Sequence, residues 1–264
     1  MNRLAGLWIQ DWAGKRVDSF GSRVLWNWEL DDLFYPNWEK FLVKMHGQGT
    51  RILAYINPCV STRVGEFKKH ARRDLFLEAE ERGFLVNKEG KEGETYVQSS
   101  ASDEFQFGTV DLTNEDAVKW YGDVVIKCNL LCRCDDANEL WPTVKEAQPD
   151  NPVQCGNGGN AKVGHGGWMA DFGEYLPFDT VMDDGTTGEV MHGFFPSTWA
   201  GVNSDAIGGG DELFFSRSGG LKSPGMAMNG GMFWVGDQNT AWDGNDGIKS
   251  ALTAYLTGGA SGFR

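Results

Sequence analysis

Two aspartates in this chain stand at the ends of apolar stretches and could act as a catalytic pair. Asp171 closes the segment GWMAD, and Asp237 closes the segment MFWVGD. Two carboxylates delivered from different strands are what glycoside hydrolysis needs, because one attacks or stabilises the anomeric carbon while the other protonates the leaving oxygen. The chain has 37 acidic residues, so helix caps and solvated acids are the competing interpretation.

A second group of residues could hold an anion. Residues 9–28, IQDWAGKRVDSFGSRVLWNW, place Lys15, Arg16 and Arg23 among tryptophans in a chain whose net charge is −13. A surface loop and an anion pocket both fit this composition. An arginine offers paired N–H donors to a tetrahedral oxyanion, and an indole N–H can add a neutral donor.

The chain alternates strands and helices in its apolar pattern. Apolar runs predict six strands, near residues 6–12, 51–58, 108–113, 167–177, 211–219 and 231–238. Helical patterns follow near residues 37–47, 114–127, 191–207 and 247–259. Polar residues recur where the strands end, at Asp11, Asn57, Asp111, Asp171, Arg217 and Asp237. This order predicts an α/β fold, a (β/α)8 TIM barrel that is truncated to about six of its eight strands and carries its function at the strand ends.

We interpret residues 1–264 as one partial catalytic domain with two interruptions. A highly charged excursion lies near residues 61–107, and a polar, Gly- and Asn-rich inserted loop lies near residues 132–164. Four cysteines cluster between residues 128 and 155, but their spacing fits no standard zinc pattern and no histidine stands at a usual distance. We therefore expect no metal site.

The composition weighs against several kinds of partner. A net charge of −13 opposes nucleic-acid binding, because proteins that hold polyanions usually present a basic face. No apolar run reaches about 18 residues, so no membrane insertion is expected. The first residues lack the apolar core of a signal peptide, and five cysteines are an odd number, which together slightly favour a cytoplasmic location. The oligomeric state does not follow from the sequence.

Several separated motifs resemble one enzyme family. The segments GWMADFGEYLP, FFSRSG and WVGDQ are similar to glycoside hydrolase family 31, retaining enzymes that cut α-glycosidic bonds, and QDW followed by SFGSR and WNWEL resembles its sulfoquinovosidase branch. The likeness runs with breaks from about residue 6 to residue 262. It implies a barrel that requires no cofactor and acts on a small-molecule glycoside. It also implies an N-terminal β-sandwich and final barrel strands that these 264 residues do not include.

The resemblance assigns roles to residues around the two aspartates. It implies that Asp171 is the nucleophile and Asp237 the general acid/base, with Arg217 as the active-site arginine that keeps Asp171 ionised. We expect the apolar residues 232–235 to desolvate Asp237 and raise its pKa. Glu174 then belongs to the nucleophile motif and orients a neighbour, while His192 matches a helix-borne histidine whose role is structural or catalytic.

The resemblance also assigns a substrate-reading role to the opening stretch. Gln10, Arg23 and Trp26 match the sulfonate-reading residues of the branch, with Asp11 accepting from a sugar hydroxyl in the same subsite. An enzyme for neutral glucosides has no use for a cation beside C6. By contrast, we interpret Lys15 and Arg16 as surface charges.

These expectations lead to a retaining α-glycosidase that hydrolyses α-sulfoquinovosides, either sulfoquinovosyl glycerol or the sulfolipid, to sulfoquinovose. Two alternatives stay open. One is an α-glucosidase or related exo-glycosidase acting on neutral sugars, and the other is a non-catalytic barrel that binds sugars or regulates.

Overall fold

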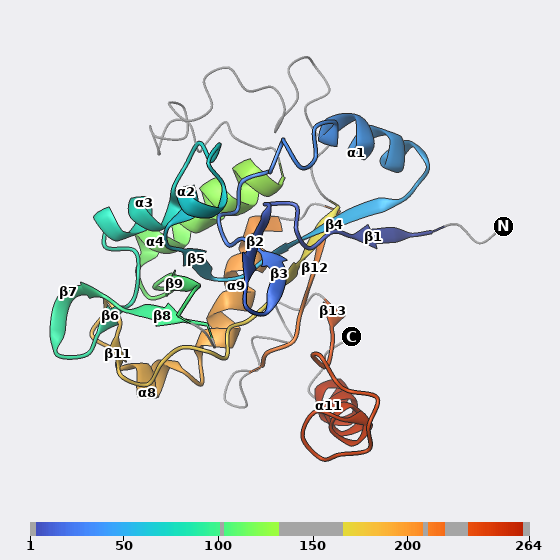
Figure 1. Cartoon of the computed structure of the whole chain (residues 1–264). Helices are drawn as coiled ribbons and strands as arrows, with labels where there is room; N and C mark the ends of the chain where they lie inside the picture. Colours follow the sequence, from blue (N-terminus) through green and yellow to red (C-terminus); the bar gives the residue numbers. More distant parts are fainter. Residues whose placement is uncertain (1–3, 101–102, 132–165, 208–210, 220–231, 261–264) are drawn as a thin grey trace.

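The computed structural model of the chain describes residues 4–100, 103–131, 166–207, 211–219 and 232–260. At its centre lies a five-stranded parallel sheet in the order β1-β4-β10-β12-β13 (Figure 1). The five strands are β1 (Gly6–Trp8), β4 (Arg51–Ile56), β10 (Gly167–Ala170), β12 (Leu213–Ser216) and β13 (Met232–Phe233). The sheet curls as an open part of a barrel, so the expected truncated TIM-barrel fold is confirmed, with one change in its strands.

The two central strands are short apolar runs because both of their faces are covered. Every residue of β10 is buried, and so are the last three residues of β4. They pair in parallel from Leu53 opposite Gly167 to Ile56 opposite Ala170. Near-continuous apolar sequence of this kind is typical of parallel strands that carry side chains into packed layers on both sides.

Helices connect and cover these strands. The helices longer than one turn beside the sheet are α1 (Trp38–Gly47), α4 (Glu115–Trp120), the π-helix η1 (Tyr121–Leu130), α9 (Phe195–Ile207) and α11 (Ile248–Ala260). Helix α1 packs on β4, and α9 packs on both η1 and β12. Pro196 lies in the first turn of α9, where its missing N–H breaks no helical hydrogen bond. No residue of α11 is buried, and it stands apart from the other helices in Figure 1.

One of the six expected barrel strands is not in the parallel sheet. The segment near residues 108–113 contributes β9 (Gln106–Thr109), which pairs antiparallel with β5 (Cys59–Ser61) and β8 (Val97–Ser99). The expectation for this segment was therefore wrong, and the described part of the chain holds five barrel strands. The reason is that β4 already uses both of its edges, one for β1 and the other for β10.

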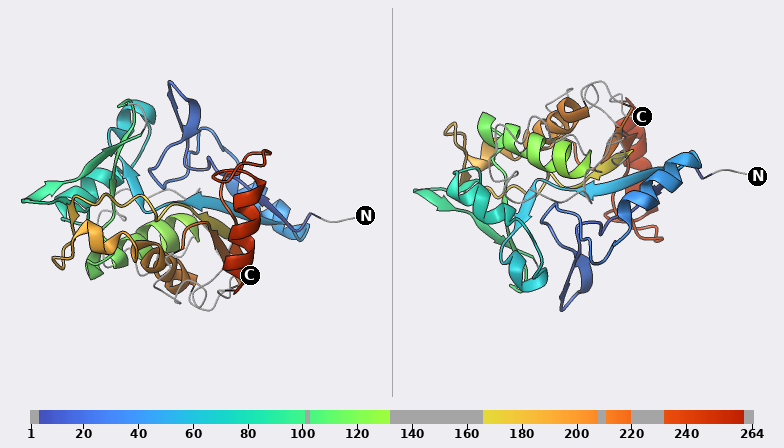
Figure 2. Two further views of the ribbon diagram at one scale, coloured as in Figure 1. Left: turned by 90° about the horizontal axis from the view of Figure 1, so that it is seen from below. Right: turned by 90° about the horizontal axis from the view of Figure 1, so that it is seen from above.

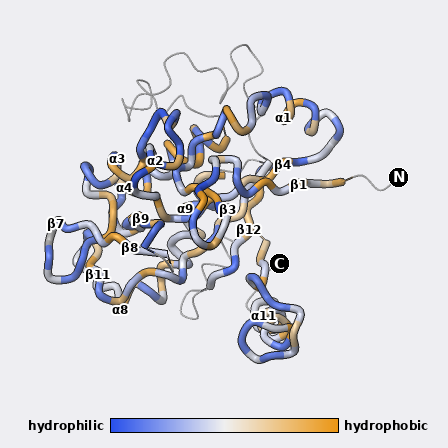
Figure 3. Tube along the Cα trace, viewed as in Figure 1, coloured by the Kyte–Doolittle hydropathy of each residue, from blue (hydrophilic) through white to orange (hydrophobic). Residues whose placement is uncertain are grey.

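The segment near residues 61–107 folds into small elements that surround β9. These are α2 (Val64–Phe67), α3 (Leu75–Glu81), β6 (Asn87–Lys88), β7 (Lys91–Thr95) and β8, and β6 also pairs with β11 (Thr180–Val181), which precedes the short helix α8 (Gly188–Met191). The β6–β7 hairpin is hydrophilic (Figure 3). The expected inserted loop near residues 132–164 lies outside the described residues.

A separate hairpin follows β1. Strands β2 (Lys15–Asp18) and β3 (Gly21–Val24) pair antiparallel, with Arg16 opposite Arg23. The hairpin projects from one side of the parallel sheet, while η1 and α9 lie on the other side (Figure 2). The stretch with the basic residues is thus an ordered hairpin, and its two strands fix which side chains share a face.

Two further expectations concern cysteines and membranes. Among the cysteines in the described residues, Cys59 is free and buried, whereas Cys128 is disulfide-bonded. The chain therefore forms at least one disulfide despite its odd cysteine count. Within the described ranges, no helix is long and apolar enough to cross a membrane.

The start of β10 generates a stability prediction. A Cβ on Gly167 would collide with the backbone oxygen of Leu213, across the pairing of β10 with β12. We expect Gly167→Ala to lower the free energy of unfolding by about 1–3 kcal/mol, because a backbone neighbour cannot move aside as a side chain can. Urea unfolding followed by circular dichroism measures this change.

Gly122→Ala is the matched control, because a Cβ on Gly122 in η1 would meet nothing within 4 Å. This variant should be as stable as the parent or more stable by about 0.5–1 kcal/mol. Equal effects of the two substitutions would contradict the close approach of β10 and β12.

Candidate active site

Asp171 stands directly after β10 and is held there by its backbone. Its N–H donates to the Ile56 carbonyl at 2.9 Å, and its carbonyl accepts from Trp199 Nε1 at 3.1 Å. These bonds tie the residue to β4 on one side and to α9 on the other. The side chain is almost enclosed, since Asp171 is only 7% exposed.

The registers of three strands place side chains from each on one face. Met169 lies opposite Tyr55 on β4 and opposite Phe215 on β12. Because side chains alternate along a strand, Asp171 shares the face of Met169, and Arg217, two residues past Phe215, shares it too. The parallel sheet thus brings a tyrosine, an aspartate and an arginine together at its C-terminal edge.

The two carboxylate oxygens of Asp171 have different surroundings. Oδ2 accepts a hydrogen bond of 2.7 Å from the Tyr55 hydroxyl, which itself accepts from Asn57 Nδ2 at 3.3 Å. Oδ1 lies 3.2 Å from Arg217 Nε, an ion pair without hydrogen-bond geometry. Oδ1 therefore accepts no hydrogen bond from the described residues and keeps its lone pairs for another partner.

Arg217 is shared between Asp171 and Glu174. Its Nε donates to Glu174 Oε1 at 2.8 Å, and Nη2 lies 2.7 Å from the same oxygen. The guanidinium also lies over the Phe172 ring, with Cζ 4.9 Å from the ring centroid. These contacts fix the guanidinium beside Asp171. The other oxygen of Glu174, Oε2, accepts no hydrogen bond within the described part of the chain.

The turn after Asp171 has a strained backbone and packs against the segment that carries Arg217. Phe172 has φ 62, in the left-handed region that non-glycine residues rarely adopt. The Ser218 hydroxyl donates to the Phe172 carbonyl at 2.6 Å, and a Cβ on Gly173 would come within 2.8 Å of Ser218 Oγ. The turn therefore packs tightly against the segment that carries Arg217.

Opposing influences act on the pKa of Asp171. Burial is the largest and raises the pKa, while the charge of Arg217 and the hydrogen bond from Tyr55 lower it. The negative charge of Asp237 acts in the same direction as burial, so the two aspartates lie close enough to interact. The net effect is a pKa raised above that of an ordinary aspartate.

Asp237 has a different setting from the one we expected. It follows β13 by four residues and its side chain is exposed. Residues 232–235 do not enclose it, because Met232 is exposed and the Trp234 ring packs on Phe215, with centroids 5.3 Å apart. The apolar enclosure that was expected for this carboxyl is absent from the described residues.

The residues of the opening stretch lie in three different environments. Gln10 is exposed. Asp11 is half-buried, accepts from the Tyr35 hydroxyl at 2.6 Å and pairs with Lys15 Nζ at 2.7 Å. Burial tends to raise the pKa of Asp11, but Lys15 and Tyr35 outweigh it and lower the pKa. Asp11 therefore remains a charged acceptor next to its lysine.

Arg23 and Trp26 differ sharply in exposure. Arg23 on β3 is exposed, and its Nη1 donates to the neighbouring Ser22 carbonyl at 3.0 Å. Trp26 is buried against three phenylalanine rings. Arg16, interpreted from sequence as a surface charge, is only 7% exposed, so that interpretation was wrong.

His192 lies at the end of α8 among structural contacts. Its Nδ1 is 2.7 Å from the Leu176 carbonyl, and its ring packs on Phe178 with centroids 4.5 Å apart. These contacts hold the loop between β10 and α8. They favour the structural role over the catalytic one for this residue.

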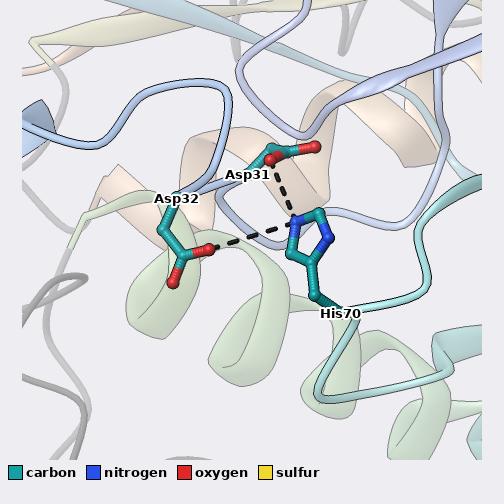
Figure 4. Close-up of side chains that lie close together, drawn as sticks. All are labelled: Asp31, Asp32 and His70. Carbon is teal, nitrogen blue, oxygen red and sulfur yellow. Dashed lines mark hydrogen bonds and ion pairs between the residues drawn. The ribbon is translucent and has the colours of Figure 1, made fainter.

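One side-chain cluster has the composition of a cation site. Ligand atoms of Asp31, Asp32 and His70 lie within 4.8 Å of one another (Figure 4). However, Asp31 Oδ1 accepts from the Phe34 N–H at 3.0 Å and lies 3.0 Å from His70 Nε2, and Asp32 forms an ion pair with Arg72. With Asp31 Oδ1 and Asp32 Oδ2 engaged in these contacts and a guanidinium beside them, the cluster is a structural cross-link between two loops.

Tyr55 was not predicted from the sequence, although its hydroxyl donates a hydrogen bond of 2.7 Å to the Asp171 carboxylate. A signal was present. In RILAYIN, Tyr55 is the one side chain with a polar tip inside an apolar strand, and it stands two residues before Asn57 on the same face.

Two known proteins are similar to this chain in sequence over nearly all of its length. The chain is 36% identical over 259 residues to the sulfoquinovosidase of Escherichia coli (strain K12), which covers 97% of the chain and 31% of that protein. It is 30% identical over 266 residues to the sulfoquinovosidase of Agrobacterium fabrum, covering 98% of the chain and 33% of that protein. The chain thus spans about a third of the length of these relatives.

A solved structure is similar to this chain in its fold. A GH31 family sulfoquinovosidase from E. rectale, in complex with an aza-sugar inhibitor, superposes with a TM-score of 0.72 at 30% identity, covering 98% of this chain and 32% of that one. The family model for the TIM-barrel domain of glycosyl hydrolases family 31 matches residues 6–264. The chain therefore belongs to glycosyl hydrolases family 31, whose TIM-barrel domain accounts for nearly all of its length.

Proposed function

We propose that the protein is a retaining α-glycosidase that hydrolyses α-sulfoquinovosides. The observation that carries this proposal is the buried carboxylate of Asp171, held between Tyr55 and Arg217 with one oxygen free of hydrogen bonds among the described residues. A carboxylate fixed at the C-terminal edge of a barrel sheet, in a family of glycosyl hydrolases, is suited to attack an anomeric carbon.

Asp171 acts as the nucleophile. One of its oxygens forms a bond to the anomeric carbon while the bond from that carbon to the leaving oxygen breaks. Oδ1 is suited to this step because no described hydrogen bond occupies it. Arg217 supports the step by keeping Asp171 ionised despite its burial, and Tyr55 holds the other oxygen in place.

Asp237 acts as the general acid and then as the general base. It gives its proton to the leaving oxygen, takes a proton from water, and the resulting hydroxide oxygen displaces Asp171 from the anomeric carbon. Two displacements on one carbon restore its configuration, so the product retains the α form. The exposure of Asp237 is compatible with access to water and to the leaving group.

Arg23 reads the sulfonate at C6 of the sugar, with Gln10 as an added polar contact. Arg23 is exposed on β3, where it donates to a backbone carbonyl and forms no ion pair with an acidic side chain of the described residues. A guanidinium without an acidic partner is available to a tetrahedral oxyanion through paired N–H donors. Trp26 is buried among phenylalanine rings, so we assign it a supporting position under this subsite.

The nucleophile assignment predicts the effect of Asp171→Asn. We expect kcat to fall at least about ten-thousandfold, because the amide cannot form the covalent intermediate. Hydrolysis of 4-nitrophenyl α-sulfoquinovoside measures this in the longest natural form of the protein that carries this chain. Glu115→Gln, an exposed acid in the first turn of α4, is the control and should leave kcat unchanged. Activity that survives Asp171→Asn would show that another residue is the nucleophile.

The substrate assignment predicts a selective effect of Arg23→Lys. The sulfonated substrate should lose about tenfold or more in kcat/KM, because lysine cannot offer the paired donors, while 4-nitrophenyl α-glucoside should change little. Arg63→Lys is the matched control, since Arg63 is exposed and belongs to none of the proposed subsites. Equal losses on both substrates, or a parent enzyme that prefers the glucoside, would favour an exo-glycosidase for neutral sugars.

The contact from Tyr55 predicts a change in pH dependence. Its hydrogen bond lowers the pKa of Asp171, so Tyr55→Phe should raise that pKa further. Since the nucleophile must be ionised, the acidic limb of the kcat/KM profile should move to higher pH. Tyr121→Phe is the control, because the Tyr121 hydroxyl donates to the Asn57 carbonyl and not to Asp171. A profile that keeps its acidic limb in Tyr55→Phe would contradict the assignment.

A further inference from the structure

Arg16 is an enclosed cation that the proposed mechanism does not use. Its guanidinium donates to the Val24 carbonyl, and its Nε pairs with Asp18 Oδ2 at 3.1 Å. Its Cζ lies 3.5 Å from the centroid of the Phe105 ring, close enough for a cation–π contact. Three different partners therefore fix this side chain. Burying a charged group costs solvation free energy, so a functional reason for the burial of Arg16 is worth seeking.

The hairpin register places Arg16 beside Arg23. The two residues are directly opposite each other on β2 and β3, and opposite residues of an antiparallel pair point to the same face. Arg16 and Asp18 turn inward, whereas Val17 between them is 75% exposed, so the shared face is the one toward the protein. Arg16 and Arg23 thus project from the same face of one hairpin, where Arg16 is buried and Arg23 is exposed.

The charges on this face are not balanced. Among the described residues, Asp18 is the one acidic side chain that pairs with Arg16, and none pairs with Arg23. Burial lowers the pKa of Arg16, and the charge of Arg23 acts in the same direction. An anion bound at Arg23 would remove this repulsion, so binding there is favoured by both cations.

An aromatic chain connects Arg16 with the proposed nucleophile. Arg16 Cζ lies 5.6 Å from the centroid of the Trp26 ring. Trp26 in turn packs edge-on against Phe105 and against Phe172, each with centroids 5.1 Å apart. Phe172 directly follows Asp171, so the ring under the hairpin belongs to the same strand end as the proposed nucleophile.

We propose that Arg16 and Arg23 form one paired-arginine anion subsite, in which Arg23 contacts the anionic group of the substrate and Arg16 is the positioning residue. Arg16 adds positive potential behind Arg23. Its contact with Trp26, which packs on Phe172, also fixes the position of the hairpin relative to Phe172. The ligand class is a sugar that carries a tetrahedral oxyanion. The proposal rests on the proposed function for the identity of that oxyanion as a sulfonate.

The kinetic test compares Arg16→Gln, Arg16→Lys and Val17→Gln on 4-nitrophenyl α-sulfoquinovoside and 4-nitrophenyl α-glucoside. Arg16→Gln should raise KM for the sulfonated substrate about tenfold, with kcat and the glucoside constants within about twofold of the parent. Arg16→Lys keeps the charge and loses the planar fork, so its KM should rise only about threefold. Val17→Gln changes an exposed residue of the same strand and should behave as the parent.

A merely structural role for Arg16 predicts another result. Equal losses on both substrates, or a larger loss in Arg16→Lys than in Arg16→Gln, would overturn the proposal. The salt dependence adds a second readout, because KM for the sulfonated substrate should rise with sodium chloride more steeply in the parent than in Arg16→Gln. If Arg16→Gln does not fold, Arg16→Met takes its place in both measurements, because methionine also removes the charge and keeps an unbranched side chain.

A binding measurement separates this proposal from the proposed function. Methanesulfonate carries the charged group without the sugar, and it should raise the melting temperature of the parent and of Val17→Gln at constant ionic strength. Arg16→Gln and Arg23→Gln should both lose this protection. Protection of the parent without sulfoquinovosidase activity would reject the proposed function and keep the paired subsite. No protection of the parent, or full protection of Arg16→Gln, would reject the subsite itself.

Discussion

The parallel pairing of β4 with β10 is the constraint on which the candidate site depends. Each strand end takes its place from this register, which sets Tyr55 opposite Met169 and lets the Asp171 N–H reach the Ile56 carbonyl. Because β12 pairs with the other edge of β10, the residue that follows β12, Arg217, arrives beside Asp171. A shift of one residue in either pairing would turn these side chains to the opposite face and separate them.

The same constraint sets an electrostatic balance. Burial between two strands and α9 by itself disfavours the ionised form of Asp171, since burial is the largest influence on its pKa and raises it. The positive charge of Arg217 opposes this effect of burial. Arg217 also forms an ion pair with Glu174, which holds the guanidinium in place beside Asp171. An anchored arginine that lies beside one free carboxylate oxygen can stabilise the ionised form without blocking it.

Patterns within the sequence predicted what depends on local periodicity. The strands β1, β4, β10, β12 and β13 and the helices α1 and α9 lie within the segments expected for them, and α11 extends one residue past its own segment. The segment of β9 was assigned to the wrong sheet, because an apolar run does not reveal which neighbour it pairs with. Arg16 was taken for a surface charge because its ring partner, Phe105, is distant in the sequence, and a local pattern cannot show such a partner. Tyr55 escaped for the same reason, since its partner Asp171 stands on another strand.

Phe172 joins the two halves of the candidate site, and its position follows from its backbone. Its left-handed φ sends the ring away from the course of β10, so the ring meets Arg217 on one side and Trp26 on another. The hairpin that carries Arg23 therefore rests, through Trp26, on the residue next to Asp171. A substrate anion held at the hairpin and an anomeric carbon held at Asp171 are then placed by one continuous packing contact. Recognition and chemistry can be aligned this closely because interiors are packed too densely to let one end move alone.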